Sequence, residues 1–320
     1  MCISANYTTS EGLTFLMLAA DSGNARIIRT VLQLAQFDVN SRDIYGRTAL
    51  AYAVKAWPYD AVEALLEIEG INVNCVDEQG MTLLMGAARS GEVAVVSRLL
   101  GLGLGANINA KDAEGRTALA HAASRGLREV IRVLLGVKGI DYNCVDSKGQ
   151  TPLMKGARSA AGGAVAVLIE LERIEINLKD NKGRTALAHA TSNGQVDNFH
   201  TLLKVDSISA NYTTSRGLTF LMLAAQSGNA SRIRSVLQLA QFDVNARDID
   251  GRSALAHAVA SRSHGAVEAL LEVESVDVHC VDKHGMTLLM HAVLTGKVEM
   301  VNRCLGFGLG ANINARDIKG

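Results

Sequence analysis

Histidine and cysteine side chains gather near the end of the chain, and these are common zinc ligands. The group comprises His257, His264, His279, His284, His291 and Cys280. Zinc needs ligand atoms at about 2 Å, usually supplied by closely spaced pairs such as Cys-x-x-Cys, and the sequence contains no such pair. We therefore expect no metal ion and no other cofactor, and we expect these histidines to be exposed polar side chains.

Two glycine-rich segments and a series of aspartates are the remaining candidates for chemistry. The segments Gly101–Gly105 and Gly306–Gly310 resemble phosphate-binding loops, but no Lys-Ser or Lys-Thr pair completes them. The aspartates recur singly and therefore predict hydrogen bonds within turns rather than an acid and base pair. They are Asp43, Asp77, Asp112, Asp146, Asp180, Asp248, Asp282 and Asp317. The sequence thus predicts no catalytic residue, no small-molecule substrate and no enzyme.

The charge and the hydropathy of the chain exclude several classes of partner. The 320 residues carry 32 basic and 32 acidic side chains, so the net charge is zero. A nucleic-acid-binding protein normally carries a basic surface, and no basic run indicates an anionic membrane surface. No apolar segment is long enough to cross a bilayer. We therefore expect a protein partner, with neither nucleic acid nor membrane.

The cysteines indicate a reducing compartment. The chain has five, an odd number, and Cys75, Cys144 and Cys280 stand at equivalent places in a repeated pattern. Neighbouring helices pack about 8–10 Å apart, whereas a disulfide needs Cα atoms within about 7 Å, so these three cannot pair. The first residues also lack a basic segment followed by an apolar one. We expect an intracellular protein, either cytoplasmic or nuclear.

A repeated unit must position all of these residues. The motif Gly-x-Thr, with Ser once in place of Thr, recurs at intervals of 34 or 35 residues. This period predicts a single repeat domain over residues 1–320, with about nine repeats and an incomplete tenth at Gly320. The repeats begin near Gly12, Gly46, Gly80, Gly115, Gly149, Gly183, Gly217, Gly251 and Gly285.

Each unit reads as two short helices and a turn. A hydroxyl such as that of Thr117 can cap the first helix, which the alanine-rich segment 118–123 then forms. A glycine such as Gly126 ends that helix. The second helix is amphipathic, for instance over 93–100, and segments such as 109–115 then form a tight turn.

These motifs resemble the ankyrin repeat. The resemblance rests on Thr151-Pro152-Leu153-Met154, on Gly115-Arg116-Thr117-Ala118-Leu119 and on tails such as Ala106-Asn107-Ile108-Asn109. It implies an all-α solenoid of helix-turn-helix units with β-turn fingers. It also implies a protein–protein interaction module that binds its partner on a concave surface of fingers and first helices. The alternative is that the chain is the recognition or sensor tail of a larger multidomain signalling or defence protein.

One position departs from the ankyrin pattern. Where the family prefers histidine, this chain alternates methionine and alanine, as in Met154 and Ala120. We therefore expect the family's histidine hydrogen-bond network to be absent from every repeat. The alternation also shows that the duplicated unit is a pair of repeats.

A longer duplication locates the candidate binding residues. Segment 4–112 aligns without gaps to segment 209–317, with 76 of 109 positions identical. The largest block of differences is the segment 55–60, and others fall on finger tips and first helices, where neutral drift and selection for a different partner both explain them. The candidates are Tyr45, Tyr52, Trp57, Tyr59, Glu78, Gln79, Arg89, Asp250, His257, Arg262, His264, Lys283, His284 and His291.

Trp57 and Tyr59 are the strongest of these candidates. Aromatic side chains are enriched among the residues that contribute most to protein interfaces, and Trp57 is the only tryptophan of the chain. It occupies a turn position where other repeats have glycine. The alternative is that Trp57 covers the helix ends of the neighbouring repeat.

Overall fold

Short helices in pairs make up the protein, for which we analysed a computed structural model. The structure describes residues 7–34, 36–56, 59–102, 107–209, 213–238, 243–306 and 308. Within these ranges the chain forms eighteen helices and only four isolated β-bridges, which confirms the all-α fold class. None of the described helices is long and apolar enough to cross a membrane.

The helices alternate between a first and a second member of each pair. The first helices are α1 (Phe15–Asp21), α3 (Ala49–Ala56), α5 (Leu83–Ser90), α7 (Ala118–Ser124), α9 (Pro152–Arg158), α11 (Ala186–Ser192), α13 (Phe220–Gln226), α15 (Ala254–Ala260) and α17 (Leu288–Leu294). The second helices are α2 (Ala25–Leu34), α4 (Tyr59–Leu66), α6 (Val93–Gly101), α8 (Arg128–Leu135), α10 (Gly163–Leu168), α12 (Val196–Leu203), α14 (Ala230–Leu237), α16 (His264–Leu271) and α18 (Val298–Gly306).

Threonine and serine hydroxyls begin the first helices, as the sequence predicts. The Thr82 hydroxyl accepts a hydrogen bond from the Met85 backbone N–H at 3.2 Å, and Thr117 accepts one from Ala120 at 3.3 Å. Ser253 accepts the equivalent bond from Ala256 at 3.3 Å. Each such cap satisfies a backbone donor that the helix itself leaves unpaired, and its loss typically costs about 1 kcal/mol.

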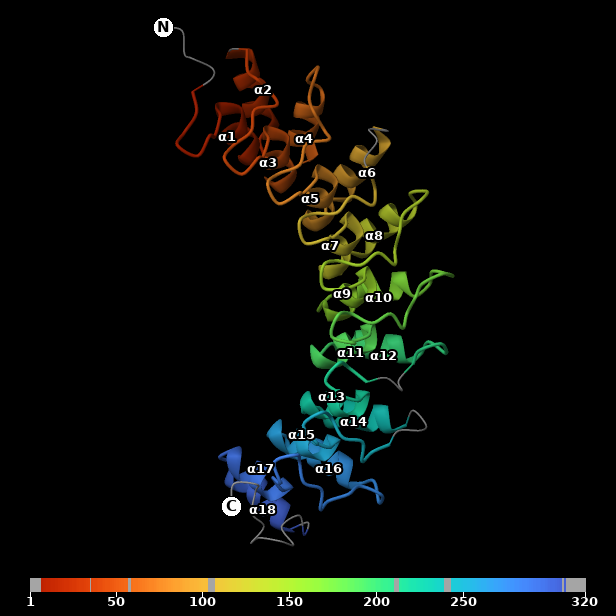
Figure 1. Ribbon diagram of the computed structural model, residues 1–320. Coiled ribbons are helices and arrows are strands. Elements are labelled where there is room, and N and C mark those ends of the chain that lie inside the picture. The colour runs from red at the N-terminus through yellow and green to blue at the C-terminus, as the bar shows by residue number, and fades with distance from the viewer. Residues whose placement is uncertain are drawn as a thin grey trace. The chain divides into compact units, whose positions relative to one another are not determined.

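The chain divides into two compact units, Met1–Ile174 and Glu175–Gly320. In the first unit the first helices α1, α3, α5, α7 and α9 contact one another in chain order, and α2, α4, α6, α8 and α10 form a second row beside them (Figure 1). In the second unit α11, α13, α15 and α17 contact one another in the same way, and α14 packs against α16. Each unit is therefore a stack of helix pairs.

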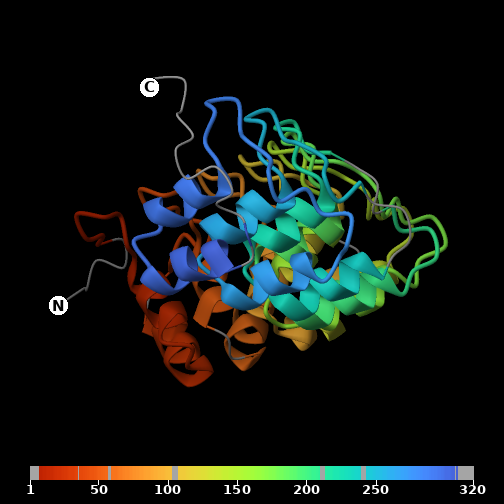
Figure 2. The same cartoon turned by 90° about the horizontal axis from the view of Figure 1, so that it is seen from below.

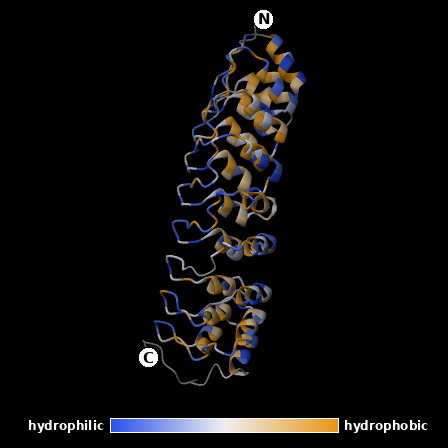
Figure 3. Cartoon of the chain, turned by 90° about the vertical axis from the view of Figure 1, so that its right-hand side faces the viewer, coloured by the Kyte–Doolittle hydropathy of each residue, from blue (hydrophilic) through white to orange (hydrophobic). Residues whose placement is uncertain are grey.

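Small and flexible apolar side chains fill the space between the pairs. Ala53, Ala87 and Ala122 have no exposed surface, and Met85 and Met154 are each 1% exposed. Small residues allow close approach of helices, and methionine adapts to irregular gaps. In Figure 3 the helices are mostly orange, for apolar residues, whereas the connecting loops are mostly blue. The core of each unit therefore lies between its helices.

The finger loops are tied to one another by backbone hydrogen bonds, which we call the finger ladder. In the first unit Glu78 N–H donates to Tyr45 O at 3.0 Å, and Ala113 N–H donates to Gln79 O at 2.8 Å. In the second unit Lys283 N–H donates to Asp250 O at 2.9 Å. The loops of the second unit, drawn in green to blue, project on one side of its helices (Figure 2).

A glycine ends each finger because the chain allows nothing larger there. Gly46 has a φ of +74°, a conformation that other residues rarely adopt. A Cβ atom at Gly46 would also lie 3.1 Å from the backbone nitrogen of Glu78, within the finger ladder. The recurring Gly-x-Thr motif thus serves the turn and the close approach of the next finger.

Candidate functional site

Most finger aspartates are held by a side chain nine residues further along, at the middle of the first helix. We call that side chain the latch residue, because it joins the finger to its helix. The described pairs are Asp43–Tyr52 (2.7 Å), Asp112–His121 (2.9 Å), Asp146–Lys155 (2.6 Å), Asp180–His189 (3.0 Å), Asp248–His257 (2.9 Å) and Asp282–His291 (3.1 Å).

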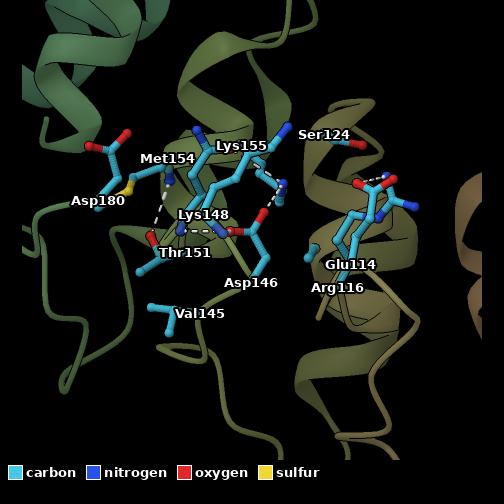
Figure 4. Close-up of polar contacts among 12 residues, drawn as sticks. Glu114, Arg116, Ser124, Val145, Asp146, Lys148, Thr151, Met154, Lys155 and Asp180 are labelled. Atoms are coloured by element: carbon cyan, nitrogen blue, oxygen red, sulfur yellow. Dashed lines mark hydrogen bonds and ion pairs between the residues drawn. The ribbon is translucent and has the colours of Figure 1, made fainter. Parts of the chain in front are cut away.

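Figure 4 shows one such pair in the first unit. Asp146 Oδ1 accepts the backbone N–H groups of Lys148 and Gln150 at 2.9 and 2.8 Å, and Lys155 Nζ lies 2.6 Å from Oδ2. Burial alone would raise the pKa of Asp146, but the bonds from Lys155 and from the backbone together hold that pKa below its usual value. The carboxylate is therefore charged at neutral pH and fixes the turn.

In three of the histidine latches, burial outweighs the neighbouring carboxylate and favours the neutral ring. Burial lowers the pKa of His121, His257 and His291, although the aspartate beside each of them raises it. A neutral imidazole can still donate its one N–H to the carboxylate. In these three latches a hydrogen bond thus joins the ring to the finger aspartate without the ring being charged.

The structure corrects one expectation from the sequence and adds a contact that the sequence analysis did not predict. The family's histidine position holds methionine or alanine, but in four described repeats a histidine one position later bonds the finger aspartate of its own repeat. Tyr52 and His257 are each only 6% exposed, so they do not lie on an exposed surface, and the side chain of His291 is 12% exposed. The signal that sequence reasoning missed is the recurring spacing of nine residues from Asp to His.

Among the finger aspartates that the structure describes, Asp77 alone lacks a latch residue. Asp77 Oδ1 accepts the backbone N–H groups of Gln79 and Met81 at 2.9 and 2.8 Å, but the latch position on α5 is Gly86. A cavity of about 360 Å³ lies there, lined by Asp77 and Gly86 among others. We call it the Gly86 cavity. Ligand pockets typically measure about 300–1,000 Å³, so this one is large enough to hold a small group.

The other candidate residues divide by exposure. Tyr45 is 47% exposed and Tyr59 is 38% exposed, and both lie in the first unit. The remaining exposed candidates are Glu78, Gln79 and Arg89 in the first unit and Arg262, Lys283 and His284 in the second. Asp250 and His264 are half-buried. Trp57 lies outside the described residues.

The finger ladder brings Tyr45, Glu78 and Gln79 to neighbouring tips. Arg47 lies over the Tyr45 ring, 4.5 Å from its centroid, and so fixes that ring beside the finger. In the second unit Asp250 pairs with Lys283 and, at 3.3 Å, with Arg216. The tips therefore form a polar and aromatic surface in the first unit and a charged surface in the second.

The cysteines are packing residues. Cys75, Cys144, Cys280 and Cys304 are free and buried, which confirms that the three equivalent cysteines form no disulfide. Cys75 and Cys280 contact the capping hydroxyls of Thr48 and Ser253, at 3.4 and 3.2 Å. Burial raises the pKa of the Cys144, Cys280 and Cys304 thiols, so each is a weak nucleophile. Across the described ranges, no group of three or more His, Cys, Asp or Glu residues could hold a metal ion.

Stacked helix pairs joined by turn fingers define a helical repeat protein. A family profile described as "Ankyrin repeats (3 copies)" matches residues 2–77, 58–146, 137–214, 206–276 and 221–317, and the chain belongs to the ankyrin repeat family. Among curated proteins, none matches the chain. Ankyrin repeats are generally protein–protein interaction modules and are typically not enzymes.

Proposed function

We propose that this ankyrin repeat chain binds a partner protein on the surface formed by its finger tips and first helices. The observation that supports this most is the separation of roles within each finger. The finger ladder uses backbone atoms only, whereas side chains such as Tyr45, Glu78 and Gln79 are exposed and take no part in it. Those side chains are therefore free to contact another molecule.

The rigidity of the fingers supports the same proposal. Each described finger with a latch is held by turn bonds, by the ladder and by the latch residue, as at Asp112. A surface that is already ordered loses little conformational entropy when it binds. Tyr52, His257 and His291 thus contribute to binding indirectly, because they hold the fingers in place.

We assign direct contacts to the exposed candidates. In the first unit these are Tyr45, Tyr59, Glu78, Gln79 and Arg89, and Trp57 stays a candidate from the sequence alone. In the second unit they are Arg262, Lys283 and His284, with Asp250 and His264 beside them. Tyrosine, tryptophan and arginine are the types most enriched among interface hot spots, so Tyr45 and Arg89 are the first to test.

The experiment begins by identifying a partner through affinity capture and mass spectrometry. Its affinity is then measured for the wild type, Tyr45→Ala and Arg89→Ala. The control is Glu129→Ala on the second helix α8, where the Glu129 side chain is 63% exposed and pairs only with Arg132 at the surface. We expect Tyr45→Ala, on a finger tip, and Arg89→Ala, on the first helix α5, each to lose about 30-fold in affinity, the ~2 kcal/mol of a hot spot, and the control to change little. Equal effects on tip and control would refute the proposed surface.

A further inference from the structure

The Gly86 cavity is the space that a latch side chain would fill. In the duplicated copy, Asp282 stands at the place of Asp77, and His291 bonds it at 3.1 Å. A Cβ atom built on Gly86 would meet only Val54 Cγ1, at 3.4 Å, so the helix itself leaves room for a side chain. The cavity is therefore a latch site whose side chain the chain does not supply.

The cavity presents an acceptor that lacks a partner. Asp77 Oδ1 takes two backbone N–H groups, and no hydrogen bond or ion pair joins Oδ2 to any described residue. In the neighbouring finger, the equivalent oxygen of Asp43 accepts the Tyr52 hydroxyl at 2.7 Å. Asp77 Oδ2 is thus available to a hydrogen-bond donor from outside its own finger.

Four basic side chains line the same cavity, and one of them, Arg47, is paired with Asp43. Lys55, Arg89 and Arg125 are exposed, and none forms an ion pair within the part of the chain that the structure describes. The duplicated copy has Ala260 and Leu294 at the places of Lys55 and Arg89. The basic rim and the empty latch position therefore occur together, in the first copy only.

We propose that the Gly86 cavity binds a tyrosine side chain that an acidic segment of the partner protein presents. The phenol O–H donates to Asp77 as Tyr52 does to Asp43, and the ring packs against Ala51, Val54 and Leu83, which line the cavity. The basic rim repels a lysine or arginine and attracts acidic residues beside the tyrosine, whereas Asp77 repels an anion at the floor. This inference rests on the proposed function.

The first test uses p-cresol, the side chain of tyrosine, with the full chain. Saturation-transfer NMR should detect binding to the wild type and lose it in Gly86→His, where the chain fills its own cavity. Asp77→Asn should bind about tenfold more weakly, because the charged acceptor is gone. Toluene lacks the hydroxyl, so it should bind the wild type no more tightly than p-cresol binds Asp77→Asn. Equal binding of p-cresol to the wild type and to Gly86→His would overturn the proposal.

His291→Gly is the matched control, since it opens the equivalent gap in the second copy without the basic rim. The second test compares the peptides Glu-Asp-Tyr-Glu-Asp, Glu-Asp-Phe-Glu-Asp and Lys-Lys-Tyr-Lys-Lys by calorimetry. The acidic tyrosine peptide should bind the wild-type cavity more tightly than the other two peptides do, and its affinity should fall in 0.5 M salt. At the His291→Gly gap, which has no basic rim, its acidic residues should not increase the affinity. Equal binding of the phenylalanine peptide, or tighter binding of the lysine peptide, would refute the assignment.

These tests need no natural partner, so their outcome is separate from that of the proposed function. Failure of p-cresol and of the acidic peptide would remove the tyrosine site, whereas Tyr45→Ala, which does not line the cavity, would still test the proposed function. Conversely, a partner that binds away from the fingers would refute the proposed function even if p-cresol occupied the cavity.

Discussion

The latch makes a sharp prediction about two equivalent aspartates, one with a latch residue and one without. In Asp112, Oδ1 accepts the backbone N–H groups of Glu114 and Arg116 at 2.9 and 2.8 Å. Oδ2 accepts Arg116 Nε at 2.8 Å and His121 Nε2 at 2.9 Å. In Asp112→Asn the carbonyl can keep the first pair of bonds, but the amide nitrogen then faces two donors.

The loss of stability in Asp112→Asn follows from how deeply the two donors, His121 and Arg116, are buried. A hydrogen bond to a charged acceptor contributes about 1.5–3 kcal/mol, and this applies to His121, whose side chain is 5% exposed. The Arg116 side chain is 27% exposed, so its ion pair contributes about 0–1 kcal/mol. We expect Asp112→Asn to cost about 2–4 kcal/mol, whereas Asp77→Asn should cost no more than about 0.5 kcal/mol, because Asp77 has no latch.

Repeat arrays open locally, so the assay must report on the finger itself. Amide hydrogen exchange of segment 112–117, measured by mass spectrometry, should accelerate strongly in Asp112→Asn. Exchange of segment 77–82 should change little in Asp77→Asn. Urea unfolding gives the overall loss for each variant. If both substitutions cost the same, the latch contributes nothing and the reasoning is wrong.

Three further predictions concern pH, one turn and the thiols. The folded pKa of His121, His257 and His291 is lowered, so the unfolded chain takes up protons first, and stability should fall as the pH drops below about 6.5. The slope should be at most about 1.4 kcal/mol per pH unit for each histidine, and a urea midpoint that stays constant from pH 8 to pH 5 would contradict it. Arg262 has a φ of +62° where equivalent turns have glycine, so Arg262→Gly should stabilise by about 0.5–1 kcal/mol, and a lower melting temperature would count against this. Cys75, Cys144 and Cys280 should react with iodoacetamide slowly when folded and rapidly in urea, and equal rates would show that they are not buried.

The sequence was sufficient for the period, the helix pairs and the hydroxyl caps, because these depend on local chemistry. Thr82 and Thr117 cap their helices where the Gly-x-Thr motif predicts. The latch was missed because it depends on one distance in space, between a finger and the middle of the helix that follows. A family pattern pointed to Ala120, whereas the ring that meets Asp112 belongs to its neighbour, His121.

Comparison of the two copies could not distinguish exposed finger-tip residues from buried residues that hold the fingers in place. Tyr52 and Tyr45 both differ between the copies, yet Tyr52 is 6% exposed and Tyr45 is 47% exposed. A difference between copies records that a position tolerates change and says nothing of burial. The Gly86 cavity could not be predicted from the sequence either, because Gly86 is recognised as an empty latch position only after the other latch residues have been identified.

The finger ladder has a consequence for how such a chain can change its partner. The bond from Glu78 N–H to Tyr45 O has its counterpart from Lys283 N–H to Asp250 O, at 3.0 and 2.9 Å, although the side chains differ in size and in charge. The backbone atoms that form the ladder and the side-chain atoms that we propose another protein contacts are therefore different atoms of the same residues. A single substitution can reverse the charge of a tip without altering the register of the fingers. A new binding specificity can thus arise by successive single substitutions, each of which leaves the protein folded. For the same reason, the finger tips are suitable positions to randomise in a binding library.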